Sequence, residues 1–458
     1  MLQDINKDPN KIGEEINSLL EKTLSGSKIL EKDIAKQPVV KLASRYWKKL
    51  GPGLVTGAAD DDPSGIATYS QAGAGFGFQL LWLASFTFPF MAVVQEMCAR
   101  IGLETGRGLA GNIRIHFPKR ILYLVTALLF AVNTLNLGVD LGAMAKAAQL
   151  ILPSVHFGLL IVVFSLVSLF LEIFTSYRQY TRYLKYLALI LFSYVLATLC
   201  IKLNWQQVLT QAIIPSITFS REQLFIICGI LGTTISPYLF FWQTAQENEE
   251  EICFGRKTIK QRIGMTNQEK KDMRIDVWSG MFISNLIMFF IITATAGTLY
   301  FNGIRIINTP QEAALALQPL AGNLAYLLFS IGIIGTGFLT IPILAGASSY
   351  AIAETFRWKE GLWRKLKDAY AFYGVIIIST LIGLLINFLG IDPIKALLYT
   401  AVINGLVAPV ILVLIVSISS NKKIMGENAN SPFTTFLGWL IAGLMVASGA
   451  GAIVSIFG

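Results

Sequence analysis

Long apolar runs alternate with short polar connections from about residue 50 to the C-terminal end of the chain. A helix needs about 20 apolar residues to cross the hydrocarbon core of a bilayer. Spans of this kind can be drawn at 53–76, 79–102, 120–148, 155–175, 183–203, 222–243, 276–300, 321–354, 369–389, 393–418 and 432–457. The pattern therefore predicts an all-α, polytopic membrane protein with about eleven transmembrane helices.

The first 47 residues do not follow this pattern. They are polar and charged and lack the apolar core segment of a cleavable signal sequence. We expect residues 1–47 to form a cytoplasmic N-terminal tail and residues 48–458 to form the transmembrane domain.

Composition agrees with a membrane protein, because 54% of the 458 residues are hydrophobic and only 14% are charged. The net charge of +9 reflects membrane topology rather than a nucleic-acid partner. Basic clusters occupy every second connection, at 107–120, 178–185, 256–274, 357–367 and 422–423. By the positive-inside rule, this distribution places the N-terminus in the cytoplasm and the C-terminus outside the cell. We therefore expect a multi-pass protein of the plasma membrane. The four cysteines lack the spacing of a metal site or a disulfide framework.

Three consecutive carboxylates, Asp60, Asp61 and Asp62, precede Pro63 inside the first span. An ionisable residue at bilayer depth costs roughly 2.5–3.5 kcal/mol on insertion scales, so acids there usually face a cavity or an ion. The alternative is a helix end in the headgroup region where the acids are merely solvated. The nearly uncharged residues on both sides favour a functional site.

The sixth span has a similar interruption at Ser236-Pro237. A proline in mid-span breaks the helical hydrogen-bond pattern, and freed carbonyls are tolerated only where they line protein or a cavity. Breaks five spans apart predict an inverted repeat of about 50–203 against about 222–418, with 432–457 as an extra helix. Two unrelated proline kinks are the alternative.

Oxygen ligands dominate these two breaks. Asp62 is the strongest candidate ligand, Ser236 offers a hydroxyl, and the carbonyls of Ala59 and Thr233 lose their helical partners. Such a set of oxygen ligands suits hard cations. We expect no resident cofactor. Asp60 and Asp61 would draw cations towards the site. A symporter for an organic anion uses the same repeat, although three aspartates would repel that anion. A channel has little support. The sequence also lacks the spacing of a nucleophile and a base that would indicate an enzyme.

The chain resembles the Nramp family of divalent metal transporters over about residues 48–455. The resemblance is carried by Gly51-Pro52-Gly53, Asp62-Pro63, Ala67-Thr68, Gln71-Ala72-Gly73-Ala74, Leu81-Trp82, Gln95-Glu96, Ala99-Arg100, Gly102, Thr105-Gly106 and Pro237. It implies eleven or twelve spans in the inverted-repeat amino-acid-transporter fold, a cytoplasmic N-terminus, and proton-coupled uptake of manganese or iron.

Departures from the family pattern fall at the metal site. The family's DPGN motif is here Asp62-Pro63-Ser64-Gly65, so Gly65 replaces the asparagine ligand, and the family's MPH becomes Ser236-Pro237-Tyr238. The thioether and the histidine associated with proton movement are therefore absent from these positions. Asn133 and Asn136 stand near the third-span acids, with Asp140 shifted. The pattern is similar to that of the Nramp-related magnesium transporters, which lack the usual proton route.

We therefore predict import of a divalent cation of the Mn²⁺, Mg²⁺ and Fe²⁺ class by alternating access, with weak or absent proton co-transport. The alternatives are an Nramp-related Mg²⁺ transporter without proton coupling, or a cation-coupled organic solute symporter of the same fold. The predicted metal site comprises Asp62, Ala59, Gly65, Thr233 and Ser236. The pathway or surrounding residues are Asp60, Asp61, Ser64, Tyr238, Asp140 and Asn404. The sequence leaves the oligomeric state open.

Two further positions allow different interpretations. Asn404 either approaches the cavity or makes an interhelical hydrogen bond. The acidic cluster from Glu247 to Glu251 is interpreted as a solvated cytoplasmic segment rather than a regulatory metal site.

Overall fold

The computed structural model describes residues 50–175 and 188–457, and all regular structure within them is helical. The α-helices are α3 (Pro52–Asp60), α4 (Pro63–Phe76), α5 (Leu81–Thr105), α6 (Leu109–His116), α7 (Lys119–Ile151), α8 (Phe157–Phe174), α10 (Phe192–Cys200), α11 (Trp205–Ile213), α12 (Arg221–Thr234), α13 (Pro237–Cys253), α14 (Ile259–Arg262), α15 (Asn267–Thr298), α16 (Pro310–Ala314), α17 (Gln318–Ala321), α18 (Ala325–Phe356), α19 (Tyr370–Ile386), α20 (Pro393–Ser419), α21 (Lys422–Met425) and α22 (Pro432–Phe457). The predicted tail 1–47 and the basic cluster 178–185 lie outside the described residues.

A helical segment lies at each of the predicted spans. Among the described residues, eight helical segments are long and apolar enough to cross a membrane. The other three spans correspond to shorter pieces: the divided pair α3 and α4, the helix α10 with the short turn Ala188–Leu191 before it, and the 17-residue helix α19.

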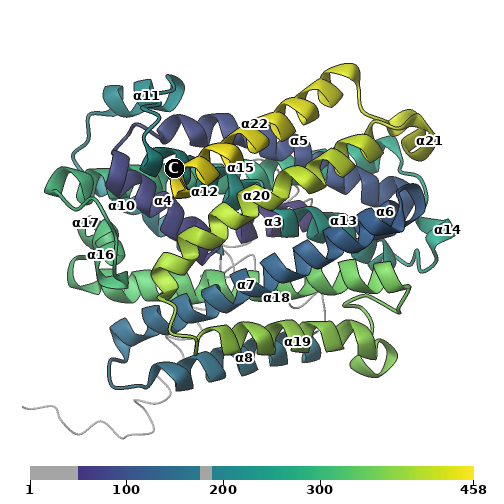
Figure 1. Cartoon of the computed structure of the whole chain (residues 1–458), viewed down its shortest axis with the longest axis horizontal. Helices are drawn as coiled ribbons and strands as arrows, with labels where there is room; N and C mark the ends of the chain where they lie inside the picture. The colour runs from purple at the N-terminus through teal and green to yellow at the C-terminus, as the bar shows by residue number, and fades with distance from the viewer. Residues whose placement is uncertain (1–49, 176–187, 458) are drawn as a thin grey trace, which may run out of the picture. The chain divides into compact units, whose positions relative to one another are not determined.

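The helix connections gather at two ends of the bundle formed by residues 52–457. Helices α6, α14 and α21 lie at the right of Figure 1, and α10, α11, α16 and α17 lie at the left. We call the right-hand end the basic face, because the described basic clusters at 107–120, 256–274, 357–367 and 422–423 lie in its connections. The other end is the opposite face.

The first span is interrupted between α3 and α4, as predicted. Helix α3 ends at Asp60, and α4 begins at Pro63, whose ring fits the first helical position because no N–H is needed there. Asp62 caps α4 by accepting a hydrogen bond from the Gly65 N–H. Proline and a capping carboxylate together end one helix and start the next.

The sixth span is interrupted in the same way. Helix α12 ends at Thr234, α13 begins at Pro237, and the residue before the proline, Ser236, has extended backbone angles. The residue before a proline is disfavoured in the helical region, which explains the position of this break.

Close backbone contacts hold the half-helices in place. A Cβ on Gly57 of α3 would lie 2.3 Å from the carbonyl oxygen of Gly280 in α15, so only glycine permits this approach. Similarly, a Cβ on Gly232 of α12 would lie 2.0 Å from the carbonyl oxygen of Ala401 in α20. Helix α3 is also anchored to α15 at its start, where Asp276 accepts hydrogen bonds from two of its free N–H groups.

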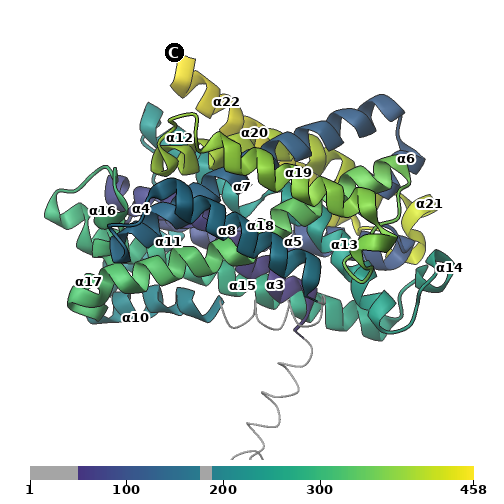
Figure 2. The same cartoon turned by 90° about the horizontal axis from the view of Figure 1, so that it is seen from below.

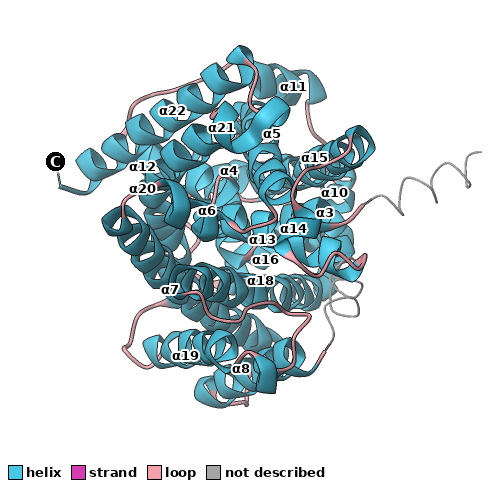
Figure 3. Ribbon diagram, turned by 90° about the vertical axis from the view of Figure 1, so that its right-hand side faces the viewer, coloured by secondary structure: helices cyan, strands magenta, loops and turns pink. Residues whose placement is uncertain are grey.

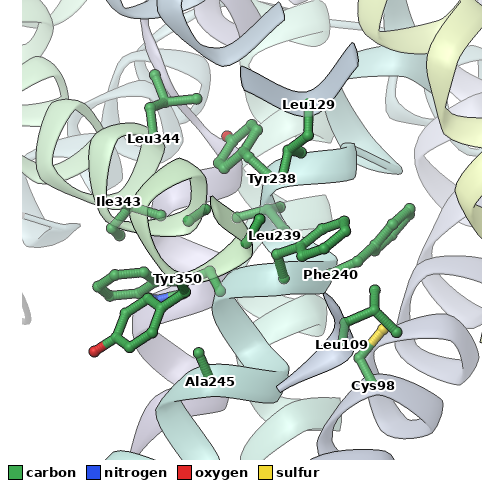
Figure 4. Packing of buried hydrophobic residues seen from close by; sticks show 14 of the residues in the cluster. Cys98, Leu109, Leu129, Tyr238, Leu239, Phe240, Ala245, Ile343, Leu344 and Tyr350 are labelled. Carbon is green, nitrogen blue, oxygen red and sulfur yellow. The ribbon is translucent and has the colours of Figure 1, made fainter. Parts of the chain in front are cut away.

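Apolar side chains fill the space between the breaks and the basic face. Tyr238, Leu239 and Phe240 at the start of α13 belong to one buried cluster with Leu129 of α7 and Leu344 of α18 (Figure 4). Helices α8 and α19 pack together and lie away from α3 and α4 (Figures 1 and 3), so they stand in front of the bundle when it is seen from below (Figure 2). The breaks therefore lie deep in the bundle, with a packed apolar layer on one side.

Candidate functional site

The carboxylate of Asp62 lies at the break of the first span and is surrounded by hydrogen-bond donors. Its Oδ1 accepts from the Gly65 N–H at 2.5 Å, from the Ser64 hydroxyl at 2.9 Å and from the Thr233 hydroxyl at 3.5 Å. Its Oδ2 accepts from Nδ2 of Asn136 at 3.1 Å. The structure thus brings α4, α7 and α12 together around one buried carboxylate.

The backbone at Gly65 is closely surrounded by oxygen atoms, one of them from Asp62. A Cβ there would lie 3.0 Å from the Asp60 carbonyl oxygen, 3.1 Å from Oγ1 of Thr233 and 3.2 Å from Oδ1 of Asp62. Oxygens from both broken spans therefore converge on the point that a larger residue would occupy. Oxygen atoms are the ligands that Mg²⁺ and Ca²⁺ prefer.

The two carbonyls expected to be freed by the breaks are hydrogen-bonded to hydroxyl groups. The carbonyl of Ala59 accepts from the Tyr238 hydroxyl at 2.9 Å. The Ser236 hydroxyl lies 2.6 Å from the Thr233 carbonyl and 2.8 Å from the Gly232 carbonyl. Ser236 therefore caps α12 in this state, and its hydroxyl is directed at the backbone rather than at Asp62.

Among the described residues, neither Asp60 nor Asp61 shares a hydrogen-bond donor with Asp62. Asp60 accepts a hydrogen bond of 2.7 Å from the Ser284 hydroxyl of α15. Neither carboxylate oxygen of Asp61 has a hydrogen-bond partner among the described residues, although the side chain is fully buried. In the part of the chain that the structure describes, no three His, Cys, Asp or Glu side chains converge on one point. A cation beside Asp62 would therefore rely on neutral oxygens in addition to this one carboxylate.

Helix α7 contributes a polar face. Asn136 contacts Asp62 directly, whereas Nδ2 of Asn133 donates to Oγ of Ser348 at 3.0 Å. Asp140 is buried, and neither of its carboxylate oxygens has a hydrogen-bond partner among the described residues. Since α7 runs from the basic face to the opposite face, Asp140 lies one turn beyond Asn136 towards the opposite face.

Asn136 is the residue that sequence reasoning placed least well. Its place near the family's third-span acids indicates only a missing proton carrier, whereas the structure shows a direct contact with Asp62. The spacing of Asn133, Asn136 and Asp140, at i, i+3 and i+7, is the signal that these polar residues share one helix face.

Asn404 of α20 is buried, and its amide has no hydrogen-bond partner among the described residues. The interhelical hydrogen bond considered for it is therefore not formed in this structure. It is adjacent to Gly405, whose backbone lies close to Gly232 of α12.

The site is closed to solvent. Asp62 is 1% exposed, and Thr233, Ser236 and Tyr238 are also buried. A cavity of about 30 Å³ with mainly apolar walls lies on the opposite-face side of the break, against Pro63. This volume holds only one or two water molecules. Ion entry from either face therefore requires a change of conformation.

The predicted solvation of the acidic cluster at the end of α13 is wrong for three of its residues. Glu247, Glu249 and Glu251 are buried, and Glu249 is 2% exposed. The Glu249 carboxylate accepts from the Tyr350 hydroxyl at 2.6 Å and from the Leu362 N–H at 2.9 Å. Segments distant in sequence cover these acids and supply donors to Glu249, which the local pattern could not indicate.

Comparisons with known proteins agree with this architecture. The family "Natural resistance-associated macrophage protein-like" (Nramp) matches residues 53–455. A crystal structure of a manganese transporter from Eremococcus coleocola, in complex with an aromatic bis-isothiourea substituted compound, is 18% identical with a TM-score of 0.66 and covers 90% of this chain and 88% of that chain. The nucleobase-cation-symport-1 family transporter Mhp1, in a closed conformation with bromovinylhydantoin bound, is 14% identical with a TM-score of 0.56 and covers 89% and 91% of the two chains.

The family match, together with the fold and its two broken helices, defines a multi-pass membrane transporter rather than an enzyme. More particularly, the chain belongs to the Nramp family of divalent metal transporters, since the family match extends over most of its length. The predicted fold class and family resemblance are confirmed.

Proposed function

We propose that this protein imports hard divalent cations, Mg²⁺ as well as Mn²⁺ and Fe²⁺, at a site centred on Asp62. The observation that carries the proposal is the convergence of the Asp60 carbonyl, Thr233 Oγ1 and Asp62 Oδ1 around Gly65. None of the contacts described for Asp62 involves sulfur or imidazole, the ligands that favour softer metals.

Because Gly65 has no side chain that could act as a ligand, the proposed cation keeps part of its water shell in a conformation more open than this closely packed one. Mg²⁺ dehydrates reluctantly and usually binds through one or two carboxylates with several waters retained. Asp62 supplies one carboxylate, and the amide oxygen of Asn136, which has no partner among the described residues, supplies a neutral ligand after rotation of the amide. The carbonyls of Ala59 and Thr233 join the site when their hydroxyl partners release them.

Transport requires two states in which the site opens to opposite faces, with the ion stabilising passage between them. We assign the basic face to the cytoplasm, because lysine and arginine are concentrated there. Cation uptake without proton co-transport is the favoured mode. An organic-anion symporter is disfavoured, because the Asp62 carboxylate, with its four hydrogen-bond donors, occupies the site where an anionic substrate would have to bind.

The test is uptake into proteoliposomes of Mg²⁺, Mn²⁺ and Ca²⁺, with internal pH monitored and Asp62→Ala as the inactive control. Millimolar Mg²⁺ should compete with Mn²⁺ in the parent protein. Ser236→Met should strengthen Cd²⁺ binding, because a thioether favours softer ions. Tight Cd²⁺ binding by the parent in calorimetry, without any effect of Mg²⁺, would contradict the proposal and indicate an ordinary transition-metal transporter.

A further inference from the structure

A pocket of about 680 Å³ opens at the basic face, far along the chain from the residues of the metal site. It is formed by the end of α8, the last residue of α13, the connection from α18 to α19, and the first turn of α19. Its walls include the apolar side chains of Phe174, Leu362 and Leu366. The proposed cation transport makes no use of this pocket.

The pocket is positively charged. Arg364, Lys365 and Lys367 line it, whereas none of the described residues that line it is acidic. Lys365 and Lys367 are exposed, and the described part of the chain offers neither of them an ion pair. The Arg364 guanidinium stacks 4.1 Å from the Trp363 ring. Its Nε also donates to the Glu360 carbonyl at 3.0 Å. The described lining therefore contains three basic residues and no carboxylate.

The backbone that carries these cations is anchored. The buried carboxylate of Glu249 accepts hydrogen bonds from the N–H groups of Leu362 and Trp363, at 2.9 and 3.2 Å. The Tyr373 hydroxyl donates to the Arg364 carbonyl at 2.7 Å. An anchored backbone reduces the entropy lost when the pocket binds a ligand.

The pocket lies at the edge of the lipid-facing surface. Helix α8 is 18 residues long and strongly apolar, and its Phe170 and Phe174 are exposed, the latter to 70%. Tyr370, at the start of α19, is 69% exposed. Tyrosine and tryptophan are enriched where a membrane protein crosses from hydrocarbon to headgroups, so the cations lie at headgroup depth.

We infer that this pocket binds an anionic phospholipid. The phosphate contacts Arg364, Lys365 and Lys367, and the acyl chains lie against Phe174, Leu362 and Leu366. Basic pockets between transmembrane helices at the cytoplasmic side suit lipids with negative headgroups. A zwitterionic lipid carries its own compensating cation, and a free phosphate has no chains for the apolar wall, so both bind less tightly.

The inference is tested by native mass spectrometry of the full chain released from detergent, with phosphatidylglycerol, phosphatidylcholine or glycerol phosphate added separately. The parent should retain phosphatidylglycerol preferentially. The triple variant R364Q/K365Q/K367Q should bind the lipid roughly 150-fold more weakly, since each juxtamembrane cation contributes about 1 kcal/mol of attraction to anionic lipid, or about fivefold, and three are removed. The melting temperature of the triple variant without lipid reports whether it is folded. The single variant K365Q, at an exposed lysine, should lose less of the bound phosphatidylglycerol than the triple variant does.

The matched control is K260Q/K422Q/K423Q, which removes three charges from exposed positions of the basic face outside the pocket. It should retain the lipid like the parent. Equal retention of the two phospholipids by the parent, an equal loss in the control, or glycerol phosphate binding as well as the lipid would each overturn the inference. None of these results depends on which ion is transported, so failure here leaves the proposed function untouched.

Discussion

The hydroxyl of Tyr238 donates a 2.9 Å hydrogen bond to the carbonyl oxygen of Ala59. This bond joins α13 to α3, the two half-helices that lead from the breaks towards the basic face. It supplies a donor to a carbonyl that the break deprives of its helical partner. The same carbonyl is a candidate ligand, so the tyrosine and a bound cation would compete for it.

Tyr238→Phe should therefore lower the stability of the ion-free protein and increase the stabilisation produced by Mg²⁺. A buried carbonyl left without a donor costs about 1–3 kcal/mol, and a cation that coordinates it offsets part of that cost. The measurement is the melting temperature with and without Mg²⁺. Tyr373→Phe is the matched control, because it removes a similar bond to the Arg364 carbonyl away from the metal site. Identical Mg²⁺-dependent shifts in the two variants would exclude the Ala59 carbonyl as a ligand.

Asp62→Ala should reduce Mn²⁺ and Mg²⁺ uptake at least roughly tenfold while the protein remains folded, because a contact to a charged group contributes about 1.5–3 kcal/mol. Asp60→Asn and Asp61→Asn should do less harm, since neither side chain shares the hydrogen-bond donors of Asp62, and should mainly weaken apparent affinity at low ionic strength, where charges are least screened. Proteoliposome uptake and size-exclusion chromatography of the purified variants give the comparison. Equal losses in all three variants would indicate one shared site instead.

Gly65→Ala should weaken cation binding, because the added Cβ would lie 3.0–3.2 Å from the three oxygens that converge there. Gly75→Ala in the same helix is the control, since its Cβ would meet its nearest neighbour at 3.4 Å, an ordinary contact. That change should be neutral or stabilise the helix by about 0.5–1 kcal/mol. Calorimetry with Mg²⁺ and Mn²⁺ measures both variants. Unchanged affinity in Gly65→Ala would show that the space beside residue 65 is not part of the cation site.

Metal uptake should proceed without acidification of the liposome interior. A proton relay from Asp62 to the basic face would need a titratable residue on that side of α7. Asn133 lies on that side and cannot carry a proton, whereas Asp140 lies on the opposite-face side. Tyr238 occupies the position of the family's histidine, and a phenol with an unperturbed pKa near 10 seldom ionises at neutral pH. An internal pH indicator during uptake provides the measurement. Acidification that accompanies uptake and disappears in Asp140→Asn would show that a proton relay exists in altered form.

The basic face should be cytoplasmic. In a Cys200→Ser background, Gln206→Cys on the opposite face should react with an impermeant maleimide added to intact cells, and Lys260→Cys on the basic face should react only after the cells are opened. Both positions are exposed, which makes the pair a matched comparison of the two faces. The reverse pattern of labelling would overturn the assigned orientation.

The sequence by itself determined the helical spans, the two breaks and the family. These features are local: a span follows from an uninterrupted apolar run, and a break follows from a proline with a capping or extended residue before it. The position of the Asp62 carboxylate at the first break could be predicted for the same reason, because a carboxylate beside a mid-span proline is visible in a few adjacent residues. The tail 1–47, the repeat boundaries and the ligand set stay predictions.

Only the tertiary structure decided which groups surround that carboxylate. Asn136 contacts Asp62 across 74 positions of sequence, and Tyr238 reaches Ala59 across 179. Glu249 is buried because the connection after α18 folds over it and supplies its donors, although its acidic neighbours suggested a solvated segment. The local pattern specifies which residues form a helix, but the partners of a buried polar group come from whichever segments the packing brings next to it.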